Sequence, residues 1–240
     1  MSNKHFKLRE DLSIEFHGVK LFRIEATRDI ERLSVKAGYL GGYVEKEVNL
    51  RGNAWVSGNA HVYGNARVSG NAHVSGNAHV YGNARVYGDA YVCGDALVYG
   101  NAHVWGGAIV HGSAHVYDNA WVCDNVCVRG DAQVYGNARV YGYAIVCGDK
   151  IKNTSECRNI VNERYNITIL PEFLKIGCKF YTKKEWWGFT DREIIEMEGK
   201  DGLKWWKKWK PILMAICDAE SDGNNEDTAI FQTEEKGKVE

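Results

Sequence analysis

The chain has 240 residues, enough for one or two domains with a buried core. Its net charge of −1 excludes a general attraction to nucleic acid or to an anionic membrane. It contains neither an early apolar run of signal-peptide length nor an apolar segment long enough to span a bilayer. We therefore expect a soluble, cytoplasmic protein with no membrane partner and no nucleic-acid partner.

The cysteines number seven, and none form the C-x-x-C spacing of zinc ribbons and thioredoxin-like redox sites. We expect free thiols in a reducing compartment, no metal site and no cofactor.

In chain order, residues 1–39 are expected to form an N-terminal β cap. Within them, "GVKLFRIEATRDI" at 18–30 is typical of a strand and a turn, well placed to cover the first coil of a solenoid.

A six-residue repeat then runs sixteen times from Gly52 to Cys147 without insertion or deletion. Its third residue is Ala except at Val126, and its fifth is always Val. Because strand side chains alternate between faces, these Ala and Val residues point to one side, and Gly with Asn or Asp supplies a bend. The pattern predicts a solenoid with a stacked Val and Ala interior.

The repeat resembles the hexapeptide repeat of left-handed parallel β-helices, as in Val56 followed by Ala60. It departs from the common form by placing Gly two residues after the aliphatic position. The resemblance implies three hexads per triangular coil, hence a mainly β fold with about six 18-residue coils over 40–149. It also implies that the alternative function is a hexapeptide acyltransferase using a coil histidine.

The segment "LFRIEATRDIERLSVKAGYLGGYVEKEVNLRGNAWV" further resembles the opening of poorly characterised hexapeptide-repeat proteins of phages and prophages. This resemblance covers roughly residues 20–147. It implies a phage accessory protein acting in the cytoplasm of the bacterial host.

An 18-residue coil sorts the outward residues into columns. One column is entirely tyrosine, which supports that coil length and predicts an aromatic ladder: Tyr63, Tyr81, Tyr99, Tyr117 and Tyr135. Beside it lie His61, His79 and His115, where a structural ladder, a ligand-stacking platform and a metal site are the alternatives. The column is interrupted by Leu97, so no metal is expected.

A second face is apolar and is expected to contact another copy of the chain, with a trimer favoured, or the protein's own helix, or an external partner. Its candidate residues are Trp55, Tyr91, Ile109 and Ile145, with Trp205, Trp206 and Trp209 from the C-terminal helix.

The third face combines arginine with aromatic rings, which is the chemistry that binds nucleotides or acidic peptides, although a solvated β surface has the same composition. Its candidate ligand-binding residues are Arg67, Arg85, His103, Trp121 and Arg139, beside Tyr87, Trp105 and Tyr141.

After Cys147 the repeat is expected to fail, because Lys152 falls on the Val position. Residues 150–219 predict a small α+β region, with two strands in 164–182 around Pro171. Capping boxes at Thr182 and Thr190 precede a Trp- and Lys-rich helix over 201–217, with a break or kink at Pro211. Residues 220–240 are acidic and predict a disordered tail.

No projecting loop walls a pocket between residues 52 and 147, so no catalytic residue is assigned. The sequence favours a non-catalytic binding or interaction protein, forming a homo-oligomer. Its expected partner is a host protein or a small anionic ligand such as a nucleotide.

Overall fold

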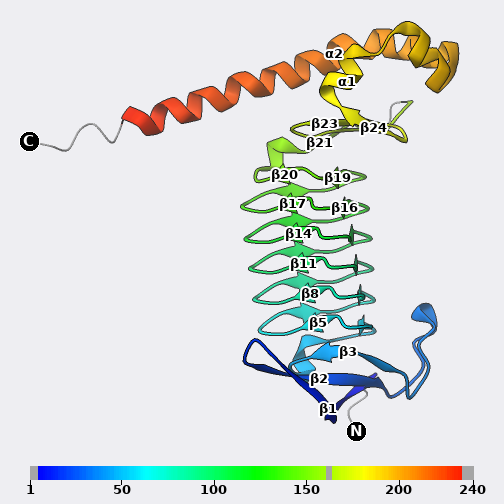
Figure 1. Ribbon diagram of the computed structural model, residues 1–240, viewed down its shortest axis with the longest axis vertical. Helices are drawn as coiled ribbons and strands as arrows, with labels where there is room; N and C mark the ends of the chain where they lie inside the picture. The colour runs from blue at the N-terminus through cyan, green and yellow to red at the C-terminus, as the bar shows by residue number, and fades with distance from the viewer. Residues whose placement is uncertain (1–4, 161–163, 234–240) are drawn as a thin grey trace, which may run out of the picture. The chain divides into compact units, whose positions relative to one another are not determined.

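The computed structural model describes residues 5–160 and 164–233, and side chains up to residue 218. The chain divides into two compact units, Met1–Phe180 and Tyr181–Glu240. The first unit contains a parallel β-solenoid of about six coils, stacked in one direction from the N-terminal cap (Figure 1). This confirms the predicted mainly β solenoid.

Each hexad forms one short strand, and every third strand joins the same sheet. The nine-stranded sheet contains β1 (Phe6–Phe16), β2 (Val19–Ala26), β3 (Leu40–Val44), β5 (His61–Val62), β8 (His79–Val80), β11 (Leu97–Val98), β14 (His115–Val116), β17 (Gln133–Val134) and β20 (Lys150–Ile151). The six-stranded sheet contains β4 (Trp55–Val56), β7 (His73–Val74), β10 (Tyr91–Val92), β13 (Ile109–Val110), β16 (Cys127–Arg129) and β19 (Ile145–Cys147). The five-stranded sheet contains β6 (Arg67–Val68), β9 (Arg85–Val86), β12 (His103–Val104), β15 (Trp121–Val122) and β18 (Arg139–Val140).

The strand register establishes the coil length. Val62 pairs with Val80, and Val80 with Val98, so each residue lies on the residue 18 positions later. The repeated Ala and Val side chains fill the interior and are at most 1% exposed. Outward residues are therefore carried on a rigid frame with fixed spacing.

The corners of the coil need a left-handed backbone, which explains the repeated glycine. Gly94 has φ of +71°, and a Cβ added to it would lie 3.0 Å from the Gly112 nitrogen in the next coil. Asp118 and Asp124 occupy equivalent corners with φ of 55° and 61°. Their carboxylates accept hydrogen bonds from backbone N–H groups one coil later, at 3.1 and 2.9 Å.

The cap extends the nine-stranded sheet beyond the first coil. β1 and β2 form an antiparallel hairpin, β2 pairs with β3, and β3 pairs in parallel with β5. Two short 3₁₀ helices, Glu31–Leu33 and Glu47–Asn49, lie in the connections of this region. Only the second strand of this hairpin was expected from the sequence pattern.

The six-residue frame fails after Cys147, as predicted, but the solenoid itself continues to Ile151, beyond its predicted end at residue 149. Gln133 pairs with Lys150 and Val134 with Ile151, so the last coil is one residue shorter. Ile151 thereby takes the inward position and is fully buried. A 3₁₀ helix, Thr154–Glu156, comes after it.

A small antiparallel sheet comes next, containing β21 (Arg158–Ile160), β22 (Ile167–Ile169), β23 (Phe173–Ile176) and β24 (Lys179–Thr182). Residues 164–182 thus form three strands, where two were predicted. The extra strand arises because the Gly177 region turns the chain back on itself, with φ of +57° at that glycine.

The second unit contains α1 (Lys183–Gly188) and α2 (Asp191–Thr233). Both predicted capping boxes form: Thr182 Oγ1 accepts from the Glu185 amide at 3.1 Å, and Thr190 Oγ1 from the Glu193 amide at 3.4 Å. The helix is interrupted at Gly199, with φ of 73°. It continues through Pro211, so the predicted break is not found there, and a kink at Pro211 stays a prediction. α2 runs into segment 220–240, but side chains from 219 and residues 234–240 lie outside the described part, and the disordered tail stays a prediction.

Candidate functional site

The five-stranded sheet gathers all the predicted ligand-binding residues, which we call the Arg–aromatic face. Consecutive coils pair Arg67 with Arg85, Arg85 with His103, His103 with Trp121, and Trp121 with Arg139. Tyr87, Trp105 and Tyr141 come directly after strands β9, β12 and β18. This grouping was predicted from the sequence, by taking the same position of every third six-residue repeat.

Trp121 is the centre of a three-layer stack on this face. The His103 ring lies 5.7 Å from the Trp121 ring with an interplanar angle of 23°, on the side of the preceding coil. The Arg139 guanidinium lies 4.4 Å from the Trp121 ring centre on the side of the following coil. Both faces of this indole are therefore covered, and its 37% exposure belongs to its edge.

The neighbouring rings form a second stacked pair. Tyr87 and Trp105 are parallel, with centroids 5.6 Å apart and planes 2° apart. Trp105 meets Trp121 edge to face at 5.5 Å. The Tyr87–Trp105 pair and the His103–Trp121 pair are thus each stacked, and the two pairs are close to perpendicular to each other.

The positive charge of this face is not neutralised within the described residues. Arg67, Arg85 and Arg139 are exposed, and none of them forms an ion pair with a described carboxylate. Burial lowers the pKa of His103, and the charge of Arg85 lowers it further, so this imidazole is neutral near pH 7. The arginines alone supply the charge.

The predicted tyrosine ladder is confirmed. Successive rings of its five members lie 5.0–5.1 Å apart and 1–8° from parallel. Burial raises the pKa of Tyr63, Tyr81, Tyr99 and Tyr117, so their hydroxyls stay protonated at neutral pH. Because each ring covers the next, only the end rings, Tyr63 and Tyr135, have a face that no other tyrosine covers.

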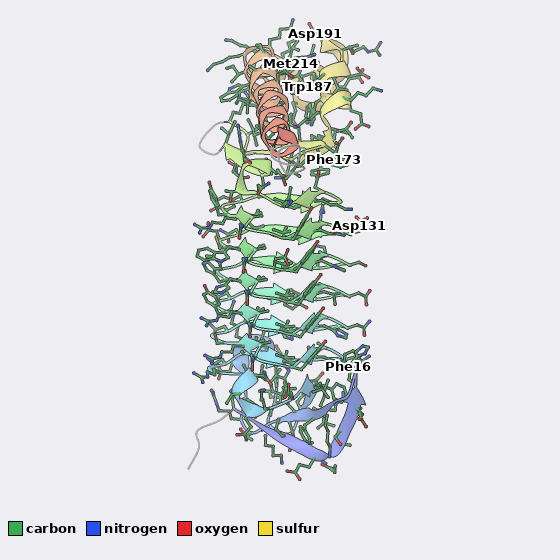
Figure 2. All side chains as sticks on the ribbon, turned by 90° about the vertical axis from the view of Figure 1, so that its left-hand side faces the viewer. Phe16, Asp131, Phe173, Trp187, Asp191 and Met214 are labelled. Atoms are coloured by element: carbon green, nitrogen blue, oxygen red, sulfur yellow. The ribbon has the colours of Figure 1, made fainter. Side chains whose placement is uncertain are left out.

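The histidines beside the ladder are covered at one end by the cap. Phe16, at the end of β1, lies against the first coils (Figure 2), with its ring 4.4 Å from His61 and 5.1 Å from His79. Burial lowers the pKa of His61 to about 4, with a further contribution from His79. In the described part of the chain, no group of three or more His, Cys, Asp or Glu side chains is placed to hold a metal ion.

Residues of the predicted contact face are only partly accessible. Trp55 is fully buried beneath the cap, so it is no part of such a face, and Trp206 is 4% exposed beside Trp186 at 5.2 Å. Trp205 and Trp209 stack on each other at 5.7 Å. Ile109 is 40% exposed, and Tyr91 and Ile145 are half-buried.

A serine–histidine contact on the six-stranded sheet escaped the sequence analysis. Ser57 Oγ lies 2.8 Å from His73 Nε2, the distance of a nucleophile and its base. The same 16-residue separation also joins Ser75 to Tyr91 and Tyr117 to Gln133. The contact therefore arises from the diagonal packing of adjacent coils, and its signal in the sequence is the 16-residue spacing.

The cysteines are free thiols, as expected. Burial raises the pKa of Cys157 to about 12 and that of Cys123 to about 11. Both are therefore protonated at neutral pH, which is unfavourable for a nucleophilic thiolate.

One cleft was also missed by the sequence analysis, because a cap loop walls it. It has a volume of about 360 Å³ and is lined by residues 28–33 with Asn53 and Asn71. Arg28 donates to Asn53 Oδ1 at 2.8 Å, and Arg32 pairs with Asp89. Arginines and carboxylates of similar number line it, so it is polar without a marked charge.

Of the described helices, none is long and apolar enough to span a membrane. The sequence matches the family described as the YdcK beta solenoid repeat at residues 60–76, 78–94 and 132–148. All three segments start on the inward Ala of the nine-stranded sheet, so the matches are in phase with the coil. No curated protein matches the chain. Fold and repeat together make this chain a β-solenoid repeat protein.

Proposed function

We propose that the protein is a non-catalytic binding protein that engages an anionic partner through the Arg–aromatic face. The observation that carries this proposal is the set of exposed arginines without described carboxylate partners, held on a rigid sheet beside Trp121. Arginine and tryptophan are the residues most enriched at binding hot spots. Guanidinium groups also bind carboxylates and phosphates through two parallel hydrogen bonds.

The partner is either a host protein or a nucleotide-like ligand. The ring geometry favours the protein, because the faces of Trp121 are occupied by His103 and Arg139 and cannot accept a base. The role of a phage accessory protein that binds or sequesters a host factor is what the sequence resemblance adds, together with a homo-oligomeric state.

The test is isothermal titration calorimetry with two defined probes, a nucleoside triphosphate and an oligoglutamate peptide. We expect binding of at least one probe to be lost when Arg67, Arg85 and Arg139 are all replaced by alanine. A matched triple variant, Arg192→Ala, Lys204→Ala and Lys208→Ala, removes the same charge from exposed positions outside the face and should bind normally. Equal binding by both triple variants would remove the Arg–aromatic face from the proposal.

A further inference from the structure

The spacing of the arginines allows the partner to be specified, and this step rests on the proposed function. Arg85 and Arg139 are separated by three coils, since Arg85 pairs with His103, His103 with Trp121 and Trp121 with Arg139. Parallel strands lie about 4.8 Å apart, so the two guanidinium-bearing positions are about 14 Å apart along the solenoid axis.

An extended peptide advances about 3.3–3.4 Å per residue, so four residues cover about 13–14 Å. Residues i and i+4 of such a peptide also point to the same side, whereas i+3 and i+5 point away. Two carboxylates four residues apart can therefore meet both arginines at once. A separation of three or five residues turns one carboxylate to solvent.

The surface between the two arginines selects the residue between the carboxylates. The edge of Trp121 and the ring of Trp105 lie there, and Trp121 is 37% exposed. The side chain at i+2 faces this surface, so an apolar residue there would bury area against the indoles. Ring edges are also electropositive, which favours the flanking carboxylates over cations.

The peptide must be held by side chains rather than by strand addition. Strands β9, β12 and β15 are internal to the five-stranded sheet, and their backbone N–H groups already donate to the next coil, as Arg85 does to Ala102 and His103 to Ala120, both at 2.9 Å. The Arg139 N–H, on the end strand β18, donates to Thr154 Oγ1 at 3.1 Å. A peptide lying along the axis crosses these strands and cannot join their ladder.

From these distances we infer that the Arg–aromatic face recognises an extended acidic segment of a partner protein, with the pattern acidic–x–apolar–x–acidic. Arg85 and Arg139 bind the two carboxylates, and Trp105 and Trp121 contact the apolar residue. Arg67, one coil before Arg85, adds positive charge at one end. Because the contacts are charged and exposed, the affinity should fall as salt is raised.

The experiment is fluorescence anisotropy of the full chain with labelled peptides of identical composition. One peptide places glutamates at i and i+4 around a central leucine, and others place them at i+3 or i+5. We expect the i+4 peptide to bind at least about tenfold more tightly, because the others lose one charge-assisted pair. Arg85→Ala and Arg139→Ala should each remove this preference, and Arg192→Ala should keep it.

Reversing the charges of protein and peptide together should create a new binding pair. The double variant Arg85→Glu and Arg139→Glu should bind the corresponding peptide with lysines at i and i+4, which the unaltered protein should not bind. Binding of all acidic peptides with equal affinity would overturn the spacing while leaving the proposed function intact. Binding of a nucleoside triphosphate but of no peptide would overturn the peptide partner, and binding of no probe at all would overturn both.

Discussion

The nine-stranded and five-stranded sheets of the solenoid have the same interior but different outer surfaces. On the nine-stranded side, five tyrosines repeat without exception, and their rings lie 1–8° from parallel. On the five-stranded side, Tyr87, Trp105 and Trp121 meet at angles from 2° to 76°. In the uniform column each tyrosine ring stacks on its neighbours. In the mixed column, charged groups and ring edges stay exposed and can contact a partner. In such a repeat protein the irregular column is therefore the better guide to function.

Both surfaces are carried by the same stacked coils, and substitution of a corner glycine tests how closely these coils pack. Gly94→Ala should destabilise the protein by about 2–5 kcal/mol, because a left-handed alanine costs about 1–2 kcal/mol and crowding against Gly112 about 1–3 kcal/mol. The measurement is the free energy of unfolding in urea.

Gly18→Ala is the matched control for this substitution. Gly18 also has a left-handed φ of +75°, but nothing lies within 4 Å of an added Cβ. It should show only the backbone cost of about 1–2 kcal/mol. Equal losses for the two variants would mean that adjacent coils are not closely packed at their corners.

Replacing one tyrosine on each side sharpens the contrast directly. Tyr99→Ala removes two parallel ring contacts of 5.0 Å each and should cost about 1–3 kcal/mol. Tyr141→Ala, on the other side, removes a ring that is 53% exposed and should change stability by less than about 0.5 kcal/mol. Thermal and urea unfolding of the two variants provide the measurement. A similar loss in both would show that the mixed column is also a structural ladder.

Much of this contrast could be predicted from the sequence, because a repeat without insertions transmits its register from coil to coil. Once Ala and Val are assigned inward, the faces of Tyr63, Arg85 and Trp121 are found by counting. The shortened last coil could not be found in this way, since a one-residue deletion moves Ile151 into the position that counting gives to Lys152.

The features that could not be predicted from the repeat depend on contacts with segments outside it. Trp55 occupies an outward position of its hexad, yet the cap covers it completely. Phe16 reaches His61 only because β1 folds back along β2. The interruption at Gly199 has a local cause, since glycine readily adopts the positive φ of 73° found there. The orientation of each ring in the Arg–aromatic face likewise depends on its neighbours in three dimensions.

The last prediction concerns the change in folding stability with pH that His61 causes, on the side of the tyrosine ladder. The pKa of His61 is lowered from 6.5 to about 4 in the folded protein, chiefly by burial under Phe16. Between these values the unfolded chain binds the proton more strongly than the folded one. Stability should therefore fall as the pH decreases from about 6.5 to about 4.

His61→Phe should reduce this loss, because the new ring can occupy the same aromatic surroundings, and His61 Nδ1 has no described hydrogen-bond partner to lose. The readout is the difference in urea midpoint between about pH 7 and about pH 5. Some dependence should remain, since burial also lowers the pKa of His79. His115→Phe, three coils further along the same sheet and away from the hairpin, is the control. If it flattened the pH dependence as much as His61→Phe, burial by the cap would not be the cause, and the two ends of this sheet would be equivalent.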